Sequence, residues 1–519
     1  MKTLISTLLL SFAFTSLSAK VTMPRIFSDN MVLQRESKAN LWGTADANST
    51  VTIQASWQKT TVTTKADANG KWQTSIQTPE AGGPYTIYVT DKRTPPTPHK
   101  GEKASRSTST APSLAGKAGM GLSASTDGVL LQNILSGEVW ICAGQSNMEM
   151  PMKGFKNQPV ENAVADILHS KDSQLRLFTI KRTSSFLPKD DVQGEWLLSE
   201  PQSVREFSAT AYYFGKELRQ MLDVPVGLIC AAWGGSACEA WMTADWLRAF
   251  PDAKIPQQES DIKSKNRTPT VLYNGMLSPI IGYTMRGAIW YQGEDNVPRF
   301  QTYADMMATM VKGWRSEWKQ GDFPFYYCQI APYDYTLVNM KPNSALLREQ
   351  QSKAELMIPN CGMAVLMDCG MEWGIHPRKK NLAGQRLALL ALDNTYGVKG
   401  LTSKSAYYKN MTVSNDTCTV SFERADMWIY GEKGYLSECF EVAGADKVFH
   451  PAKAVVERSK VIVTCEEVKK PVAVRYAFKD WVQGDLFCDG IPVSSFRTDN
   501  WDIGLIEADK PAIDYDKQR

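Results

Sequence analysis

Apolar and polar positions divide the chain into three stretches with different periodicity. Apolar residues alternate with polar ones near the N-terminus, at 51–55 and 85–89, and short runs rich in valine, separated by Pro and Gly turns, occur near the C-terminus, at 461–464 and 472–476. Both patterns are typical of β-strands, so each end predicts a β-sandwich. The central stretch instead contains continuous apolar runs of strand length, at 138–143, 226–233, 286–291, 323–330 and 361–368.

Segments with helical spacing of apolar residues separate the central runs. We expect these helices at 208–222, where Ser208 is the N-cap, and at 303–318, 344–357 and 377–395. Strands that alternate with helices predict a parallel sheet with right-handed crossovers, which gives a doubly wound, three-layer α/β/α domain. Ligands of such folds bind beyond the carboxyl ends of the strands. Polar residues that directly follow the central runs are therefore candidates for a functional site.

Composition sets the remaining boundaries. Residues 1–19 combine Lys2, a short apolar stretch and small residues, which is the layout of a secretory signal peptide. Residues 92–127 are rich in Pro, Ser, Thr, Ala and Gly, so we expect a flexible low-complexity insertion there. The predicted order is the signal peptide, an N-terminal β-sandwich at 20–91, this insertion, an α/β domain at 128–400 and a C-terminal β-sandwich region at 401–519.

The predicted signal peptide implies a secreted or periplasmic protein. Its apolar stretch is shorter than the roughly 20 residues that span a bilayer, so we expect no membrane anchor. The net charge of +3 over 519 residues gives no field that would attract nucleic acid. The ten cysteines include no Cys-x-x-Cys pair, and those from Cys418 to Cys488 leave one or two disulfides open. The pattern specifies no oligomeric state.

The first central run ends in the polar turn Gly144–Asn147, which can expose the hydroxyl of Ser146. A serine becomes a nucleophile when a base takes its proton, and the chain has four histidines. His376 alone follows a central apolar run, so the sequence favours Ser146 as nucleophile and His376 as general base. Taken singly, Ser146 can also be a helix cap and His376 a loop residue. The other histidines fall in the insertion, a polar segment and the C-terminal region: His99, His169 and His450.

Two further polar turns follow neighbouring runs and supply hydrogen-bond donors. The backbone N–H of Gly235, in a Trp-Gly-Gly turn, can donate to the oxyanion that forms when an acyl carbonyl is attacked. Asn296, after the next run, offers a neutral amide donor, and Glu294 offers a carboxylate. Simpler roles remain open, namely a tight turn for Gly235, a turn residue for Asn296 and an acceptor of backbone N–H groups for Glu294.

Together these turns resemble the motifs of the SGNH hydrolase superfamily, most closely its sialate O-acetylesterase branch. The resemblance extends to residues 27–35 and 495–499, and thus over nearly the whole mature chain. It implies an SGNH-type, flavodoxin-like three-layer α/β/α hydrolase domain flanked by the two β-sandwich regions. The motifs occur in the family's order: Gly-Gln-Ser-Asn-Met at 144–148, Trp-Gly-Gly at 233–235 with Glu-Ala-Trp at 239–241, Trp-Tyr-Gln-Gly-Glu-x-Asn at 290–296, and His-Pro at 376–377.

The resemblance implies a secreted carbohydrate esterase that removes O-acetyl groups from sugars, most closely a sialate O-acetylesterase. Ser146 and His376 would work through an acyl-enzyme, with no metal or cofactor, while the Ser146 and Gly235 N–H groups and the Asn296 side chain receive the oxyanion. A deacetylase of xylan or another polysaccharide and a catalytically impaired carbohydrate-binding homologue are the alternatives. Arg475 and Arg497 are candidates for binding a carboxylated sugar such as sialate.

One position departs from the family pattern. Relatives read Asp-Ile-His-Pro, whereas this chain has Gly374 two residues before His376. We expect Glu372 or Asp368 to replace the missing orienting acid, or a backbone carbonyl to orient the ring in a Ser-His dyad. Site support or substrate contact is expected from five side chains in or beside the turns: Gln145, Gln292, Glu294, Trp233 and Tyr291. The aromatic residues beside the motifs are candidates for stacking on a sugar ring, with core packing as the alternative for at least two of them: Trp233, Trp241, Trp290 and Tyr291.

Overall fold

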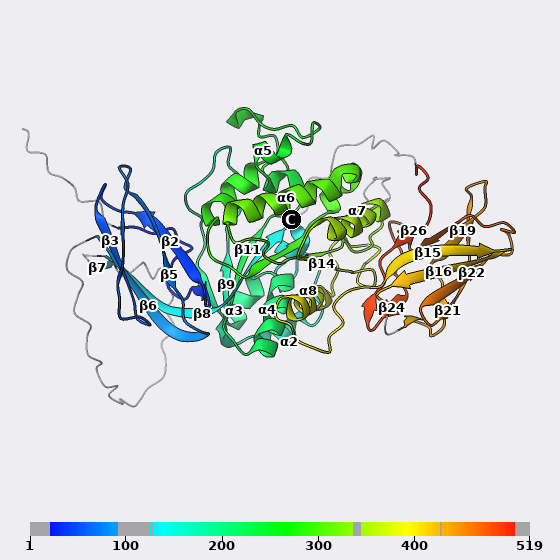
Figure 1. Cartoon of the computed structure of the whole chain (residues 1–519), viewed down its shortest axis with the longest axis horizontal. Coiled ribbons are helices and arrows are strands. Elements are labelled where there is room, and N and C mark those ends of the chain that lie inside the picture. The colour runs from blue at the N-terminus through cyan, green and yellow to red at the C-terminus, as the bar shows by residue number, and fades with distance from the viewer. Residues whose placement is uncertain (1–20, 92–123, 126–127, 336–343, 426–427, 504–519) are drawn as a thin grey trace, which may run out of the picture. The chain divides into compact units, whose positions relative to one another are not determined.

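The computed structural model describes residues 21–91, 124–125, 128–335, 344–425 and 428–503 (Figure 1). The predicted signal peptide and nearly all of the predicted insertion, including His99, lie outside these residues. The chain divides into two compact units. Of the described residues, the smaller contains 21–23, Leu41–Ile76, 85–91, 124–125 and 128–131, and the larger contains Pro24–Asn40, Gln77–Pro84 and those from Gln132 onward.

The strands near the N-terminus are β2 (Lys38–Thr44), β3 (Thr50–Ala55), β4 (Val62–Lys65), β5 (Lys71–Gln77), β6 (Gly82–Thr90) and β7 (Ala124–Ser125). β3 pairs antiparallel with β4 and β6, and β2 pairs with β5. On β3 the apolar side chains of Val51 and Ile53 are fully buried, while Thr52 and Gln54 are half-buried. This is the alternation that the sequence pattern predicts.

The larger unit is built on a central sheet whose strands are, in spatial order, β10 (Trp196–Ser199), β9 (Asp172–Thr179), β11 (Val226–Ala232), β8 (Gly128–Gly144), β12 (Gly287–Tyr291), β13 (Phe325–Cys328) and β14 (Cys361–Ala364). These strands are parallel except β10, which pairs antiparallel with β9. β1 (Val32–Gln34) pairs parallel with an earlier part of β8. The five predicted strands are present. The pattern misses β9, because polar residues and Arg176 interrupt its apolar run, and β10 makes the sheet mixed.

The helices are α1 (Ser146–Glu149), α2 (Ala163–Leu168), α3 (Pro201–Glu206), α4 (Ala209–Leu222), α5 (Ala244–Leu247), α6 (Tyr303–Trp318), α7 (Ser344–Met357) and α8 (Lys380–Asn394). α4 and α8 pack together on one side of the sheet, and α6 packs with α7 on the other, which gives the three expected layers (Figure 1). Ser208 caps α4 as predicted, since its Oγ accepts from the Ala211 N–H at 3.1 Å. α8 begins at Lys380 rather than at residue 377, because a tight turn ties Lys380 N–H to Arg378 O at 2.8 Å.

The register of the central strands brings three of the polar turns together. Gly144, the last residue of β8, lies opposite Ala232 of β11 on one side and Tyr291 of β12 on the other. β8 is thus flanked by two parallel strands that end at the same level, and the turns that follow all three emerge at the same edge of the sheet. This edge is where ligands bind in open α/β sheets.

The C-terminal strands are β15 (Tyr407–Ser414), β16 (Thr417–Glu423), β17 (Ile429–Gly431), β18 (Leu436–Ser437), β19 (Phe440–Ala443), β20 (Phe449–Pro451), β21 (Lys453–Glu457), β22 (Lys460–Thr464), β23 (Ala473–Tyr476), β24 (Leu486–Cys488), β25 (Ile491–Pro492) and β26 (Phe496–Arg497). They form antiparallel sheets in the orders β15-β16-β22-β21-β18, β20-β19-β23-β26 and β17-β24-β25. All ten cysteines fall within the described residues and are free, so the disulfides left open by the sequence are not formed.

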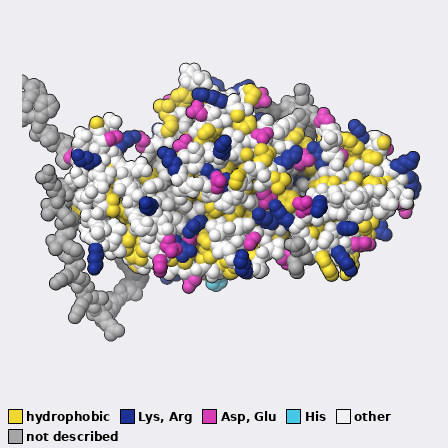
Figure 2. Space-filling model, in the orientation of Figure 1, with side chains coloured by type: hydrophobic (Ala, Val, Ile, Leu, Met, Phe, Trp, Pro, Cys, Tyr) yellow, Lys and Arg dark blue, Asp and Glu magenta, His cyan; other side chains and the backbone are white. Residues whose placement is uncertain are grey.

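Basic and acidic side chains are interspersed on the face of the molecule shown in Figure 2. Neither sign of charge dominates this face, and the net charge of the whole chain is +3. Within the described ranges, every helix is too short or too polar to cross a lipid bilayer.

Candidate active site

Ser146 begins α1 directly beyond the carboxyl end of β8. The strand ends at Gly144 with φ 142°, and a Cβ added there would lie 2.2 Å from the carbonyl oxygen of Tyr291, so the turn requires glycine. Gln145 N–H donates to the same carbonyl at 2.9 Å and closes the turn. Ser146 is 7 % exposed, and no described residue bonds its Oγ or its backbone N–H. Both groups are therefore available to a substrate.

His376 lies on the loop between β14 and α8, and side-chain contacts join this loop to the Ser146 turn. Asn147 Nδ2 donates to the carbonyl of Ile375 at 3.1 Å, and Lys380 Nζ donates to Asn147 Oδ1. Because Asn147 follows Ser146 and Ile375 precedes His376, these contacts place the start of α1, which carries Ser146, next to the loop that carries His376. Among the described residues, no hydrogen bond directly connects Ser146 with His376.

The His376 ring is held from two sides. Its Nδ1 contacts Gln158 Oε1, and the Phe155 ring meets it edge-on with centroids 5.1 Å apart. Burial, together with the nearby Lys380 ammonium, lowers the pKa of His376 to about 3, so the ring is neutral. A neutral ring that donates from Nδ1 to the Gln158 carbonyl oxygen keeps a lone pair on Nε2. This is the tautomer that a general base requires.

Neither of the acids expected to orient His376 bonds to it within the described structure. Asp368 instead forms a bidentate ion pair with Arg386, with both distances 2.7 Å. Although burial opposes ionisation, the Arg386 guanidinium holds the pKa of Asp368 below its ordinary value. Glu372 is half-buried on the same loop, and no hydrogen bond or ion pair of its side chain is formed with the described residues. Both residues are predicted only from their proximity to His376 in the sequence, which gives no indication that Arg386 pairs with Asp368.

The Trp-Gly-Gly turn lies beside the Ser146 turn. Trp233 N–H donates to Gly144 O at 3.1 Å, and Gly234 N–H donates to Glu149 Oε2 at 2.8 Å. Gly235 has φ 65°, in the left-handed region that favours glycine. Its own N–H has no acceptor among the described residues, which is the condition for an oxyanion donor.

Asn296 lies beyond β12, where its side chain is engaged by neighbouring residues. Its Nδ2 donates to Glu239 Oε2 at 2.9 Å. Its Oδ1 accepts from Cys238 N–H at 2.9 Å and from Gln292 Nε2 at 2.7 Å. Asn296 is almost fully buried, so in this arrangement it links the second and third turns and directs no bond toward Ser146.

A buried polar network beneath the Ser146 turn was not predicted from the sequence. Lys380 is fully buried, and its Nζ donates to Asn147, whose Nδ2 donates to Glu294 Oε1 at 2.5 Å. Burial lowers the pKa of Lys380 to about 7 and raises the pKa of Glu294. Gln145 also supports this loop, since its Oε1 accepts from the Gly293 N–H at 3.2 Å. The sequence signal for Lys380 is only its place four residues after His376, which an exposed lysine shares.

The aromatic residues expected near the site are mostly core residues. Trp233 is largely buried, with the Arg182 guanidinium 5.7 Å from its ring centroid. In contrast, Trp373 on the His376 loop is 76 % exposed. Three of the expected residues have no exposed surface: Tyr291, Trp241 and Trp290.

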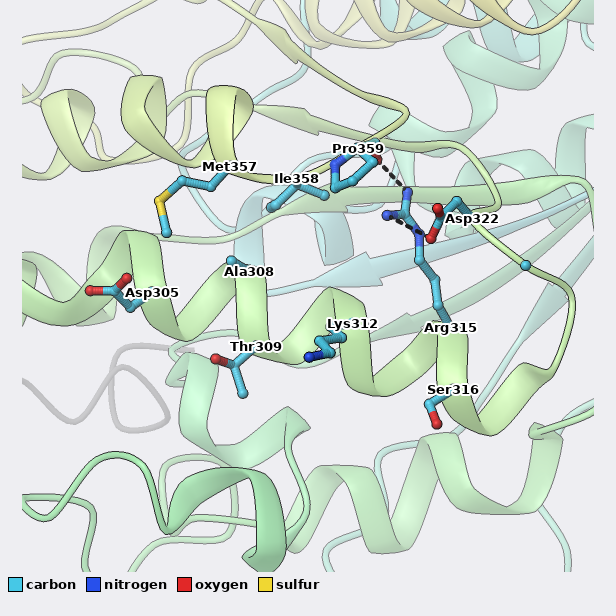
Figure 3. A pocket seen from close by; sticks show the side chains of 11 residues that line it. Asp305, Ala308, Thr309, Lys312, Arg315, Ser316, Asp322, Met357, Ile358 and Pro359 are labelled. Carbon is cyan, nitrogen blue, oxygen red and sulfur yellow. Dashed lines mark hydrogen bonds and ion pairs between the residues drawn. The ribbon is translucent and has the colours of Figure 1, made fainter.

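Pockets among the described residues of the hydrolase domain differ in their distance from the polar turns. One of about 610 Å³ is lined by α6 and by residues 357–359 (Figure 3). Arg315, which lines this pocket, donates to the carbonyls of Phe323 and Pro359, just before β13 and β14 begin. The pocket therefore lies at the amino ends of these strands, at the opposite end of the sheet from Ser146. Another of about 590 Å³ borders the third turn and is lined in part by Glu239 and Asp295.

The two arginines that the sequence offers for binding an anionic sugar, Arg475 and Arg497, each have a carboxylate partner, and so do two arginines that line the pocket beside the third turn. The nitrogen–oxygen distances of these ion pairs are 2.6 to 3.3 Å. Each carboxylate therefore compensates the positive charge of a guanidinium that would otherwise be available to a sialate carboxylate. The pairs are Arg475 with Asp499, Arg497 with Glu349, Arg267 with Asp295, and Arg299 with Glu239.

Comparison with known proteins agrees with these motifs. The family model described as carbohydrate esterase, sialic acid-specific acetylesterase, matches residues 136–387. Sialate O-acetylesterase from Pongo abelii is 27 % identical over 412 residues, a match that covers 72 % of this chain and 71 % of that protein. Sialate O-acetylesterase from Mus musculus is 24 % identical, and the match covers 88 % of this chain and 89 % of that protein. The crystal structure of a carbohydrate acetylesterase from Xanthomonas citri has a TM-score of 0.78 and 32 % identity, covering 93 % of this chain and all of that one. The chain therefore belongs to the sialic acid-specific acetylesterase family of carbohydrate esterases, in the SGNH hydrolase superfamily, and is a carboxylic-ester hydrolase.

Proposed function

We propose that this esterase is exported and removes O-acetyl groups from sugars through an acetyl-enzyme on Ser146, with His376 as the base. The observation that carries the proposal is the Asn147 side chain, which ties the Ser146 turn to the loop of His376 through Ile375. The layout of residues 1–19 supports export.

The proposed reaction begins when Ser146 Oγ attacks the acetyl carbonyl carbon and its proton passes to Nε2 of His376. The negative charge on the carbonyl oxygen is received by the backbone N–H groups of Ser146 and Gly235, which have no other acceptor among the described residues. The imidazolium then returns the proton to the departing sugar oxygen. Water, deprotonated by the same ring, hydrolyses the acetyl-enzyme and regenerates the Ser146 hydroxyl.

Two substrate classes follow from different observations. The sialate O-acetylesterases among the relatives favour an O-acetylated sialic acid. The pairing of Arg475 and Arg497 with carboxylates favours a neutral acetylated sugar, such as an acetylated xylan, because neither guanidinium is left uncompensated for a sugar carboxylate. We place the O-acetylated sialic acid first and the acetylated polysaccharide second.

The experiment is an acetate-release assay on purified protein. The wild type is expected to hydrolyse 4-nitrophenyl acetate, and Ser146→Ala and His376→Ala are each expected to lose this activity by at least about 10³-fold while remaining folded. Equal rates in the wild type and Ser146→Ala would contradict the mechanism. Acetate released from O-acetyl sialate and from acetylated xylan, compared as kcat/KM, then decides between the two substrate classes.

A further inference from the structure

The Nδ1 atom of His376 has an acceptor that the family pattern does not provide. That acceptor is Oε1 of Gln158, a neutral amide 218 positions away in the sequence. Asp368, one of the acids expected to orient the ring, is instead paired with Arg386. Gly374, which stands where relatives have the aspartate, has no side chain. We infer that Gln158 is the positioning residue of His376 and takes the place of the triad carboxylate; this inference rests on the proposed Ser146–His376 mechanism.

A tight turn holds Gln158 in place. Phe155 and Gln158 exchange two backbone hydrogen bonds, of 3.1 and 3.0 Å. Between them, Asn157 has φ 60°, a left-handed conformation that asparagine adopts more readily than most residues. The side chain of Gln158 thus starts from a backbone that is fixed on both sides, as an orienting group requires.

The same turn meets the His376 loop at two further points. The Phe155 ring packs edge-on against the imidazole, at an interplanar angle of 69°. Glu161 N–H, just after the turn, donates to the backbone carbonyl of Arg378 at 3.0 Å. The amide contact is therefore accompanied by others between residues 155–161 and residues 376–378, and together they fix the imidazole in both plane and direction.

A neutral acceptor such as the Gln158 amide can supply only one of the two functions of a triad carboxylate. It holds the proton on Nδ1 and keeps Nε2 aimed as the base, but it adds no negative charge to stabilise the imidazolium. The charged group that acts on the ring is Lys380, whose ammonium disfavours the imidazolium. This balance suits esters rather than amides, because an alkoxide leaves with less assistance from the acid than an amine does.

The test compares Gln158→Ala, which removes the acceptor, with Gln158→Glu, which supplies a carboxylate. Lys156→Ala, at an exposed position in the same turn, is the matched control. We expect Gln158→Ala to lower kcat for 4-nitrophenyl acetate by about 10- to 100-fold with KM little changed. We expect Gln158→Glu to recover kcat relative to Gln158→Ala and to move the acid limb of kcat/KM to higher pH, because a carboxylate beside Nδ1 raises the pKa of the ring. Lys156→Ala should behave as the wild type.

Two results would overturn the inference and leave the proposed function intact. One is a wild-type kcat and pH profile in Gln158→Ala while Ser146→Ala is inactive. The other is a folded Gln158→Glu that is no more active than Gln158→Ala, since a merely structural role gives no rescue by charge. Nitrogen chemical shifts of the His376 ring provide a readout besides activity: the Nδ1–H tautomer should dominate in the wild type and lose its preference in Gln158→Ala. If the wild type shows no Ser146-dependent hydrolysis, the proposed function itself fails.

Discussion

The side-chain amide of Asn266 donates to the carbonyl oxygen of Gly234 at 2.7 Å. In a trans peptide the carbonyl and the following N–H point in opposite directions. The bond therefore aims the N–H of Gly235 away from Asn266. Glu149 accepts from the N–H of Gly234 at 2.8 Å and fixes the preceding peptide as well. Two side chains thus set the direction of the proposed oxyanion donor.

This relationship makes Asn266 a positioning residue that can be tested. Asn266→Asp keeps the size of the side chain but replaces the donating NH₂ group with an acceptor, so it should release the Gly234 carbonyl. Complete loss of an oxyanion donor costs about 10²- to 10³-fold in kcat, and misorientation of one should cost about tenfold or more. Steady-state hydrolysis of 4-nitrophenyl acetate measures it, with Lys265→Ala at the exposed neighbouring position as control. An unchanged kcat would show that the turn keeps its direction without Asn266.

The pH dependence of activity should reflect the buried position of His376. Burial and Lys380 lower its pKa to about 3, from an ordinary value of 6.5. The base works only when neutral, and a lowered pKa keeps it neutral to lower pH. The acid limb of kcat/KM should therefore have its midpoint clearly below pH 6.5. A midpoint at or above 6.5 would mean that the ring is solvated or paired with a negative charge during turnover.

Removing the Lys380 charge should move that midpoint upward. Lys380→Met alone would leave Glu294 without its cation, so the variant is Lys380→Met with Glu294→Gln, which removes both buried charges. Without the ammonium the imidazolium is less disfavoured, and the pKa of His376 should rise. The measurement compares the acid limb of kcat/KM in the double variant with that in Glu294→Gln alone. Coincident limbs would mean that burial alone lowers the pKa of His376.

Trp373 should contribute to binding of the sugar and not to the chemistry. It is 76 % exposed on the loop that carries His376, whereas Tyr291, Trp241 and Trp290 offer no surface. Trp373→Ala should raise KM for an acetylated sugar about tenfold, equivalent to 1.4 kcal/mol, with kcat and the hydrolysis of 4-nitrophenyl acetate unchanged. Trp428→Ala, at another exposed tryptophan, is the control and should leave both substrates unaffected. A parallel loss on both substrates would instead indicate a disturbed His376 loop.

The sequence predicts those parts of the molecule that depend on local pattern. Continuous apolar runs indicate buried parallel strands because both faces of such strands are covered, and five of them are found in the central sheet. Turns that follow adjacent parallel strands emerge at one edge, so the fold class predicts that the polar turns share an edge, whereas the register that sets Gly144 opposite Ala232 and Tyr291 comes from the structure. β9 is missed because Arg176 interrupts its pattern.

Side-chain partners that come from distant loops were not predictable in the same way. Gln158 lies in a polar turn without periodicity, and nothing local indicates that it contacts a ring 218 positions later. The sequence offers Asp368 as an orienting acid because it does not show that Arg386, on the following helix, pairs with this carboxylate. The amide of Asn296 is directed to Glu239, a residue of the second motif, by a contact that only the folded chain defines.

The attachment of the C-terminal strands to α7 should depend on Arg348. This residue is fully buried and donates to Ser344 Oγ and to Ser495 Oγ, both at 3.1 Å, and to the carbonyl of Lys479. Arg348→Ala leaves those acceptors and the half-buried Asp480 carboxylate without a cation, so it should lower the free energy of unfolding by about 3 kcal/mol. Urea denaturation measures the change. Arg248→Ala, which removes an exposed arginine paired with Asp245, should change the stability by less than about 0.5 kcal/mol. If both variants lose the same small amount, Arg348 does not hold the C-terminal strands, and other contacts, such as the ion pair of Arg497 with Glu349, attach them.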